Sequence, residues 1–208
     1  MGLKQPFNAI SHMVGGALAS AATPFLIALA DGPLALVTVS LYSFGLVSLY
    51  TMSTLFHAIR AGPRGESWLE RLDHVGIYLL IAGTYSPVAL ILLAGTIGWV
   101  LFILAWALAA TGIVLSLTVP LGPKWVHIVG YIALGWAAVI AAPALLEKLD
   151  WIGIGWLLGG GILYSAGGFL YVRDRPQLIG RFGDHEVWHV LVLWASAMHF
   201  VFVVGYVL

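Results

Sequence analysis

The sequence contains 208 residues, of which 61% are hydrophobic and only 9% are charged. A soluble globular protein is about 25% charged, so a chain this apolar has too little polar surface to cover itself in water. A formal net charge of zero gives no reason to expect a nucleic-acid partner, and the absence of cysteine excludes disulfides and thiolate metal sites.

Seven apolar segments are each long enough to cross a bilayer as a helix of about 20 residues. They cover approximately residues 11–30, 34–58, 68–94, 97–118, 124–146, 151–172 and 185–207. The breaks between them are short and rich in turn residues, such as "AGPRG" and "VPLGPK". The sequence therefore predicts an all-α integral membrane protein, with residues 1–208 forming one bundle of seven transmembrane helices.

The basic residues predict how this bundle is oriented in the membrane. Eight of the nine Lys and Arg residues lie before the first segment or in and beside the second, fourth and sixth breaks, and only Lys148 lies in the fifth. Short cytoplasmic loops carry the excess of basic residues, so we expect a cytoplasmic N-terminus and a C-terminus outside. This orientation is opposite to that of the G-protein-coupled receptors, which argues against a receptor of that class.

The start of the third segment places an acidic residue inside the membrane. Ser67 and Glu70 fit the S-x-x-E capping box, which predicts a helix that begins near Trp68. Asp73 then lies more than one turn deeper, near the level of His57 at the end of the second segment. Ionisable groups at membrane depth are costly and are candidates for function, although a salt bridge or an interfacial carboxylate would also account for Asp73.

Six of the seven histidines fall at the predicted cytoplasmic ends of the segments, and only His199 lies deep. We interpret His74 and His127 as surface residues that are solvated or hydrogen-bonded. His199 faces roughly the same side of its helix as His185, so it either lines a cavity or makes a buried hydrogen bond.

His185 and His189 form a pair one turn apart on the same helix face, a spacing at which two imidazoles can share a metal ion. With Glu186 they match the H-E-x-x-H pattern of zinc proteases. Such a protease needs a third ligand, and His199 lies about 15 Å further along the helix, whereas metal–nitrogen bonds are about 2.0 Å long. A protease is therefore disfavoured.

The third ligand is better supplied from elsewhere at the same depth. His57 meets this requirement, and Ser53 lies one turn before it on the same helix face. Three neutral imidazoles around zinc with an open fourth position make a site of the catalytic type. A carboxylate beside that position can hold and deprotonate a zinc-bound water, and Asp73 is the best candidate for this role.

The combination of Ser53-x-x-x-His57, Asp73 and His185-x-x-x-His189 resembles the pattern of the progestin and adipoQ receptor (PAQR) superfamily. The stretches "LDHVGIYLLIAGTYSP" and "HEVWHVLVLWASAMHF" look like its bacterial hemolysin III branch. The resemblance implies zinc bound by the three histidines at the cytoplasmic side, with Asp73 near the metal-bound water. It also implies location in the bacterial inner (cytoplasmic) membrane, and it makes Glu186 accidental to the ligand set or a residue that supports the ligands.

The first motif of the family is similar to E-x-x-N-x-x-x-H. Asn8 and His12 match it, but Gln5 occupies the position of the glutamate. A glutamine keeps the hydrogen-bonding capacity of that position and loses its charge.

Three functions follow as hypotheses. The first is zinc-dependent hydrolysis of a ceramide-like amide or an ester of a membrane lipid, in the service of membrane-lipid homeostasis. The second is a zinc-stabilised lipid sensor that does not turn over substrate. The third is a pore-former, which we disfavour because no segment carries the sustained polar stripe that would line a wide aqueous pore.

Overall fold

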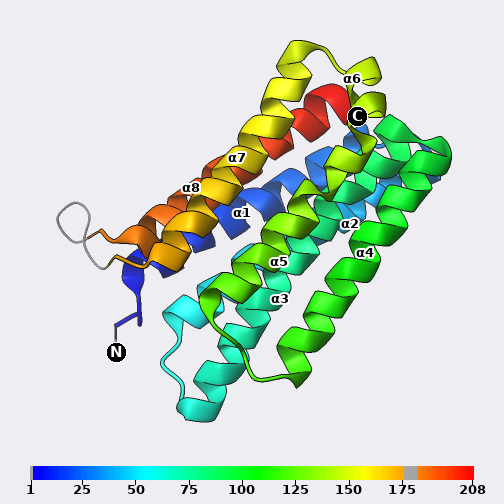
Figure 1. Cartoon of the computed structure of the whole chain (residues 1–208). Coiled ribbons are helices and arrows are strands. Elements are labelled where there is room, and N and C mark those ends of the chain that lie inside the picture. Colours follow the sequence, from blue (N-terminus) through cyan, green and yellow to red (C-terminus); the bar gives the residue numbers. More distant parts are fainter. Residues whose placement is uncertain (1, 176–181) are drawn as a thin grey trace.

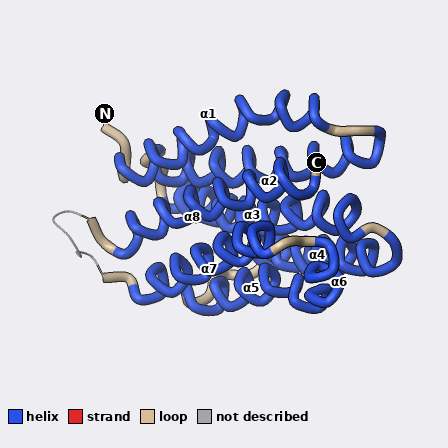
Figure 2. The backbone as a smooth tube through the Cα atoms, turned by 90° about the horizontal axis from the view of Figure 1, so that it is seen from above, coloured by secondary structure: helices blue, strands red, loops and turns tan. Residues whose placement is uncertain are grey.

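The structure is a computed structural model that describes residues 2–175 and 182–208 (Figure 1). Seven helices in this part of the chain are long and apolar enough to cross a membrane, which confirms the predicted all-α, seven-helix fold (Figure 2). Because the fifth span, Lys124–Lys148, contains two α-helices, the seven spans carry eight labels. The α-helices are α1 (Pro6–Leu29), α2 (Gly32–Ala58), α3 (Pro63–Pro87), α4 (Gly95–Thr118), α5 (Lys124–Trp136), α6 (Ala142–Lys148), α7 (Trp151–Arg173) and α8 (Asp184–Phe202).

Neighbouring helices in the chain are mostly neighbours in the bundle. Helix α2 packs against α1 and α3, α3 also packs against α4, and α7 packs against α5 and α8 (Figure 1). Helix α1 closes the arrangement because it contacts both α2 and α8. The two termini lie at opposite ends of the bundle (Figure 1). The starts of α1, α3, α5 and α8 therefore share one end with the ends of α2, α4 and α7, and we call it the site end.

The outer surface of the bundle is apolar. Leu18, Ile103 and Phe169 are 60–65% exposed, although each is a large hydrophobic side chain. In water such a surface would be an aggregation hazard, whereas lipid chains solvate it without cost. The exposed side chains thus agree with a multi-pass membrane protein.

The basic residues gather at the site end of the described chain, where Lys4, Arg60, Arg71, Lys124 and Arg173 all lie at helix ends or in the adjoining loops. Arg181 lies outside the described residues. Lys148 closes α6 at the opposite end. The predicted orientation, with a cytoplasmic N-terminus, depends on this distribution of basic residues. The orientation itself stays a prediction.

Helix α3 begins earlier than the capping-box pattern predicted. It starts at Pro63 after the N-cap residue Gly62, so Ser67 lies inside the helix and cannot cap it. Proline suits the first helical position because its fixed φ is already helical and it has no N–H group to leave unpaired. The side chain of Glu66 accepts a hydrogen bond from the backbone N–H of Ala61 at 3.2 Å, which is the role that the sequence had suggested for Glu70.

Two of the spanning segments change helical type along their length. Pro87 ends α3, and a π-helical segment follows over Val88–Leu93. The fifth span is interrupted by a 3-10 segment, Ala137–Ala141, between α5 and α6. The Tyr85 hydroxyl lies 2.9 Å from the carbonyl oxygen of Leu134 and accepts a hydrogen bond from the N–H of Ala138 at 2.8 Å. A buried side chain of α3 thus satisfies backbone groups that the break in the fifth span leaves unpaired.

Helices α2 and α3 approach closely because glycines lie at their contact. A Cβ atom on Gly45 would lie 2.5 Å from the backbone oxygen of Leu79, and one on Gly76 would lie 2.9 Å from the Cα atom of Leu49. Small residues allow this backbone approach in membrane bundles. The close packing brings the last turns of α2 against the part of α3 that contains Asp73.

Candidate metal centre

Three histidines converge at the site end of the bundle. His57 lies in the last turn of α2, and His185 and His189 lie in the first turns of α8. One ring nitrogen from each can be chosen so that all three atoms lie within 4.8 Å of one another. His57 and His189 are buried and His185 is half-buried. The structure thus brings together the three residues that the sequence predicted as ligands, whereas the metal and its identity stay predictions.

The spacing of these nitrogens suits a metal of tetrahedral geometry after a small adjustment. Bonds of 2.0–2.1 Å in a tetrahedral site place ligand nitrogens about 3.3 Å apart. The ring centroid of His57 lies 5.2 Å from that of His185 and 4.6 Å from that of His189. Small rotations of these side chains would therefore bring their nitrogens to the separation that a tetrahedral metal requires. An all-imidazole set is one that zinc accepts readily.

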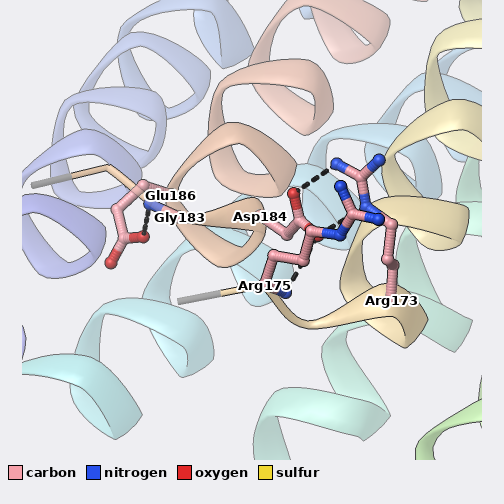
Figure 3. Close-up of polar contacts among 5 residues, drawn as sticks. All are labelled: Arg173, Arg175, Gly183, Asp184 and Glu186. Carbon is pink, nitrogen blue, oxygen red and sulfur yellow. Dashed lines mark hydrogen bonds and ion pairs between the residues drawn. The ribbon is translucent and has the colours of Figure 1, made fainter. Parts of the chain in front are cut away.

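A buried carboxylate fixes the start of α8 and therefore the position of His185. Asp184 is fully buried and accepts two hydrogen bonds from the Arg173 guanidinium, at 2.8 and 2.7 Å (Figure 3). It accepts a third bond from the backbone N–H of Arg175 at 2.9 Å. This bidentate pair is the strong form of an Arg–carboxylate interaction. It ties the end of α7 to the first residue of α8.

Glu186 caps the same helix. Its carboxylate accepts the N–H of Gly183 at 2.8 Å, so it bonds to the backbone just before α8 (Figure 3). The residue that made the sequence look like a zinc protease therefore has a helix-capping contact. It is not among the three residues of the histidine cluster.

Gln5 contacts His57, the first of the three predicted ligands, directly. The Nδ1 atom of His57 is hydrogen-bonded to the Gln5 side-chain oxygen, and the Gln5 backbone N–H donates to the His57 carbonyl at 2.9 Å. The position at which this chain departs from the family motif therefore lies against the histidine cluster, a contact that sequence reasoning missed.

Ser53 and Asp73 lie on the wall of the same cavity as His185 and His189. Ser53 is buried and its hydroxyl lies beside the half-buried carboxylate of Asp73. Asp73 therefore lies at the level of the last turns of α2, as its predicted depth indicated, although α3 begins five residues before the predicted start near 68. The catalytic roles of Ser53 and Asp73 stay predictions.

The two residues of the first motif lie against the histidine cluster. His12 is buried, and its ring centroid lies 4.0 Å from that of His189. Both His12 ring nitrogens and the Asn8 side-chain oxygen lack a hydrogen-bond partner among the described residues. Buried polar atoms of this kind are normally satisfied by water or an ion. A fourth histidine, His12, thus lies in contact with the cluster through His189, and its role stays a prediction.

Comparison with known proteins identifies the family. The family model described as "Haemolysin-III related" matches residues 3–200. The chain belongs to this family.

The relatives of this haemolysin-III-related chain include bacterial and animal proteins. It is 38% identical to "Hemolysin-3" of Bacillus cereus, over 97% of this chain and 90% of the relative. It is 35% identical to the "Hemolysin-3 homolog" of Bacillus subtilis, over 96% and 92%. It is also 26% identical to the human "Monocyte to macrophage differentiation factor", over 79% and 68%. These similarities confirm the resemblance that the motifs indicated.

A second histidine cluster in this haemolysin-III-related protein corrects the interpretation of His74 as a surface residue. His74 is buried, is hydrogen-bonded to the Tyr131 hydroxyl and lines the same cavity as Asp73. Its ring centroid lies 4.4 Å from that of half-buried His127. The sequence did contain a signal for a polar contact at this place, because His127 and Tyr131 lie at i and i+4 and therefore share one face of α5.

The cavity that joins these groups has a volume of about 150 Å³. It extends from His12 and His189 at the site end to Thr84 and Val88 deep in the bundle. His199 lines its deep part, and its Nε2 atom donates a hydrogen bond to the Leu157 carbonyl at 3.1 Å. Both alternatives proposed for His199 therefore hold.

Proposed function

We propose that this protein is a zinc-dependent hydrolase that cleaves an amide or ester bond of a membrane lipid and so serves membrane-lipid homeostasis. The observation that carries the proposal is the position of the histidine cluster. His57, His185 and His189 lie together, and the last two line the polar end of a cavity whose deeper walls are mostly apolar.

The donor set suits a zinc ion held by His57, His185 and His189. All three side chains are imidazoles, and the unpartnered nitrogens of His12 and His189 show that the site lacks some of its polar partners in the described chain. A zinc ion held by three protein ligands keeps a position open, where it polarises a carbonyl group and activates water.

Asp73 is the residue that we assign as the general base. Its carboxylate faces the cavity that His185 and His189 line, and it is the acidic residue among those lining groups. It accepts a proton from the attacking water and delivers that proton to the leaving amine or alcohol. The Ser53 hydroxyl lies beside Asp73 and orients the carboxylate. Such a positioned base contributes about 100-fold to 10,000-fold in rate.

A lipid substrate follows from the walls of the cavity. Away from the histidines they are formed by residues such as Ile77, Ile81, Leu157 and Val192. A second, mostly apolar hollow of about 260 Å³ shares Leu157, Gly161 and His199 with the first. Hydrocarbon chains fit such walls, while the head group with the scissile bond would reach the polar end.

We further propose that the site end faces the cytosol of a bacterial cell, across its inner membrane. The excess of basic residues at that end supports this orientation. The bacterial relatives support the choice of membrane. A lipid substrate would then be cleaved at the cytoplasmic side.

A second candidate function is a zinc-stabilised lipid sensor without turnover. It is favoured by the fact that the three histidines come from only two helices, α2 and α8, so that a metal would tie these helices together. In this case lipid binding would change the stability of the bundle without releasing a product.

Hydrolysis of a ceramide by the purified protein separates the two functions. We expect release of free fatty acid that stops when a chelator removes zinc and returns when zinc is added back. The variant His189→Ala should release none under the same conditions. Lipid binding without product release, in a preparation shown to contain zinc, would refute the hydrolase and favour the sensor.

A further inference from the structure

The segment before α1 is fixed against the end of α2. The backbone N–H groups of Lys4 and Gln5 donate to the carbonyl oxygens of Ala58 and His57, at 3.2 and 2.9 Å. The Lys4 ammonium also pairs with the Glu66 carboxylate at 2.5 Å. The backbone of Gln5 is therefore held beside His57 independently of what its own side chain does.

The side chain of Gln5 then reaches the imidazole of His57. Its Oε1 atom meets the His57 Nδ1 atom. An amide oxygen only accepts hydrogen bonds, so with Oε1 facing the ring the His57 Nδ1 atom carries the hydrogen and Nε2 carries the lone pair. Nε2 is thus the nitrogen that remains for a metal. The Nδ1 atom of His189 has no such partner among the described residues.

We propose that Gln5 is a positioning residue of the metal centre. It holds His57 in the tautomer that binds through Nε2, and its neutral amide makes the bound metal more exchangeable than a carboxylate at that position would. The inference rests on the proposed zinc site. An outer partner of a ligating histidine fixes its ring and raises its basicity, and a charged acceptor does so more strongly than a neutral one.

The environment of Gln5 allows a test by substitution. The residue is exposed, so a glutamate there would keep its charge in contact with water and would not bury it. Lys4 is adjacent and would also favour a negative charge. Gln5→Glu therefore strengthens the contact to His57, while Gln5→Ala removes it and leaves the backbone hydrogen bond in place.

The experiment measures zinc affinity by competition with a chromophoric chelator, on full-length protein purified in detergent. We expect Gln5→Ala to bind zinc about 10-fold to 100-fold more weakly than the parent, and Gln5→Glu to bind it more tightly. Lys4→Ala is the matched control, because it loosens the same segment and leaves the Gln5–His57 contact in place; it also removes a positive charge near the site, so its zinc affinity should not fall below that of the parent.

A second measurement reports the tautomer without any metal. In nitrogen NMR of the zinc-free protein, His57 should carry its hydrogen on Nδ1 in the parent and in Gln5→Glu. The alanine variant should show both tautomers. This readout would not change if Gln5 only stabilised the fold, and helicity and melting of each zinc-free variant identify one that has not folded.

The outcomes separate this inference from the proposed function. If the parent binds zinc and His189→Ala does not, but Gln5→Ala matches the parent, the role of Gln5 is refuted and the metal site stands. Equal loss in Lys4→Ala and Gln5→Ala would also refute it, because anchoring of the segment would then explain the effect. A parent that binds no zinc would overturn both proposals.

Discussion

Replacing Asp73 with asparagine distinguishes a catalytic site from a structural one. The substitution keeps the size of the side chain and its ability to hydrogen-bond to Ser53, but it removes the group that accepts a proton. Asp73 lies on the cavity wall and does not belong to the group of side chains that could hold the metal, so zinc should remain bound in the variant. Loss of an outer carboxylate weakens metal affinity by about 10-fold to 100-fold.

The expected loss of activity follows from the proton transfer. A positioned general base contributes at least about 100-fold, so turnover of a lipid amide should fall by about that factor or more. This factor corresponds to about 2.7 kcal/mol of transition-state stabilisation. The fall should appear in kcat, because the apolar cavity that binds the hydrocarbon chain is unchanged.

The assay determines zinc content and lipid-amide hydrolysis on the same preparation, with membrane-lipid composition followed in cells. Glu70→Gln is the matched control, since it removes an exposed carboxylate one turn earlier on α3 that does not line the cavity. Its activity should be unchanged. Retained zinc with intact cellular function in Asp73→Asn would refute the catalytic role, and complete loss of zinc would show that Asp73 is itself a ligand.

Three further predictions concern the metal, the topology and the packing. Alanine at any one of the three clustered histidines should lower zinc content and melting temperature, because metal binding stabilises the folded state. The same change at His127 or His199 should leave zinc content unchanged, and the reverse pattern would refute the ligand set. A reporter enzyme fused after Leu208 should be active only outside the membrane, and cytosolic activity would overturn the proposed orientation. Gly76→Ala should destabilise the bundle by about 1–3 kcal/mol, because the new Cβ atom would lie 2.9 Å from the Cα atom of Leu49. Gly155→Ala is its control, with no heavy atom within 4 Å, and equal melting temperatures for these two variants would refute the packing argument.

The sequence by itself determined the number and approximate extent of the spanning helices. A lipid environment requires every backbone group to be satisfied within a helix, so each crossing appears as a long and mostly apolar stretch. It also determined the pairing of His185 and His189, because residues four apart on a helix share a face. Helix depth then predicted that Asp73 lies near the level of His57, and the structure places Asp73 beside Ser53, one turn before His57 on α2.

The tertiary structure decided the features that depend on residues far apart in the chain. Helix α3 begins at Pro63, where the Glu66 carboxylate accepts a hydrogen bond from the backbone N–H of Ala61, and not at the local capping pattern of Ser67. The burial of His74 depends on α5, whose Tyr131 is 57 positions away.

The contact between Gln5 and His57 joins residues that are 52 positions apart. Hydrophobic periodicity reports only which face of a helix is apolar, and it carries no information about which helix covers that face. The polar environment of the histidine cluster was therefore set by the packing of α1, α2, α3 and α8, because only that packing places these side chains within hydrogen-bonding distance.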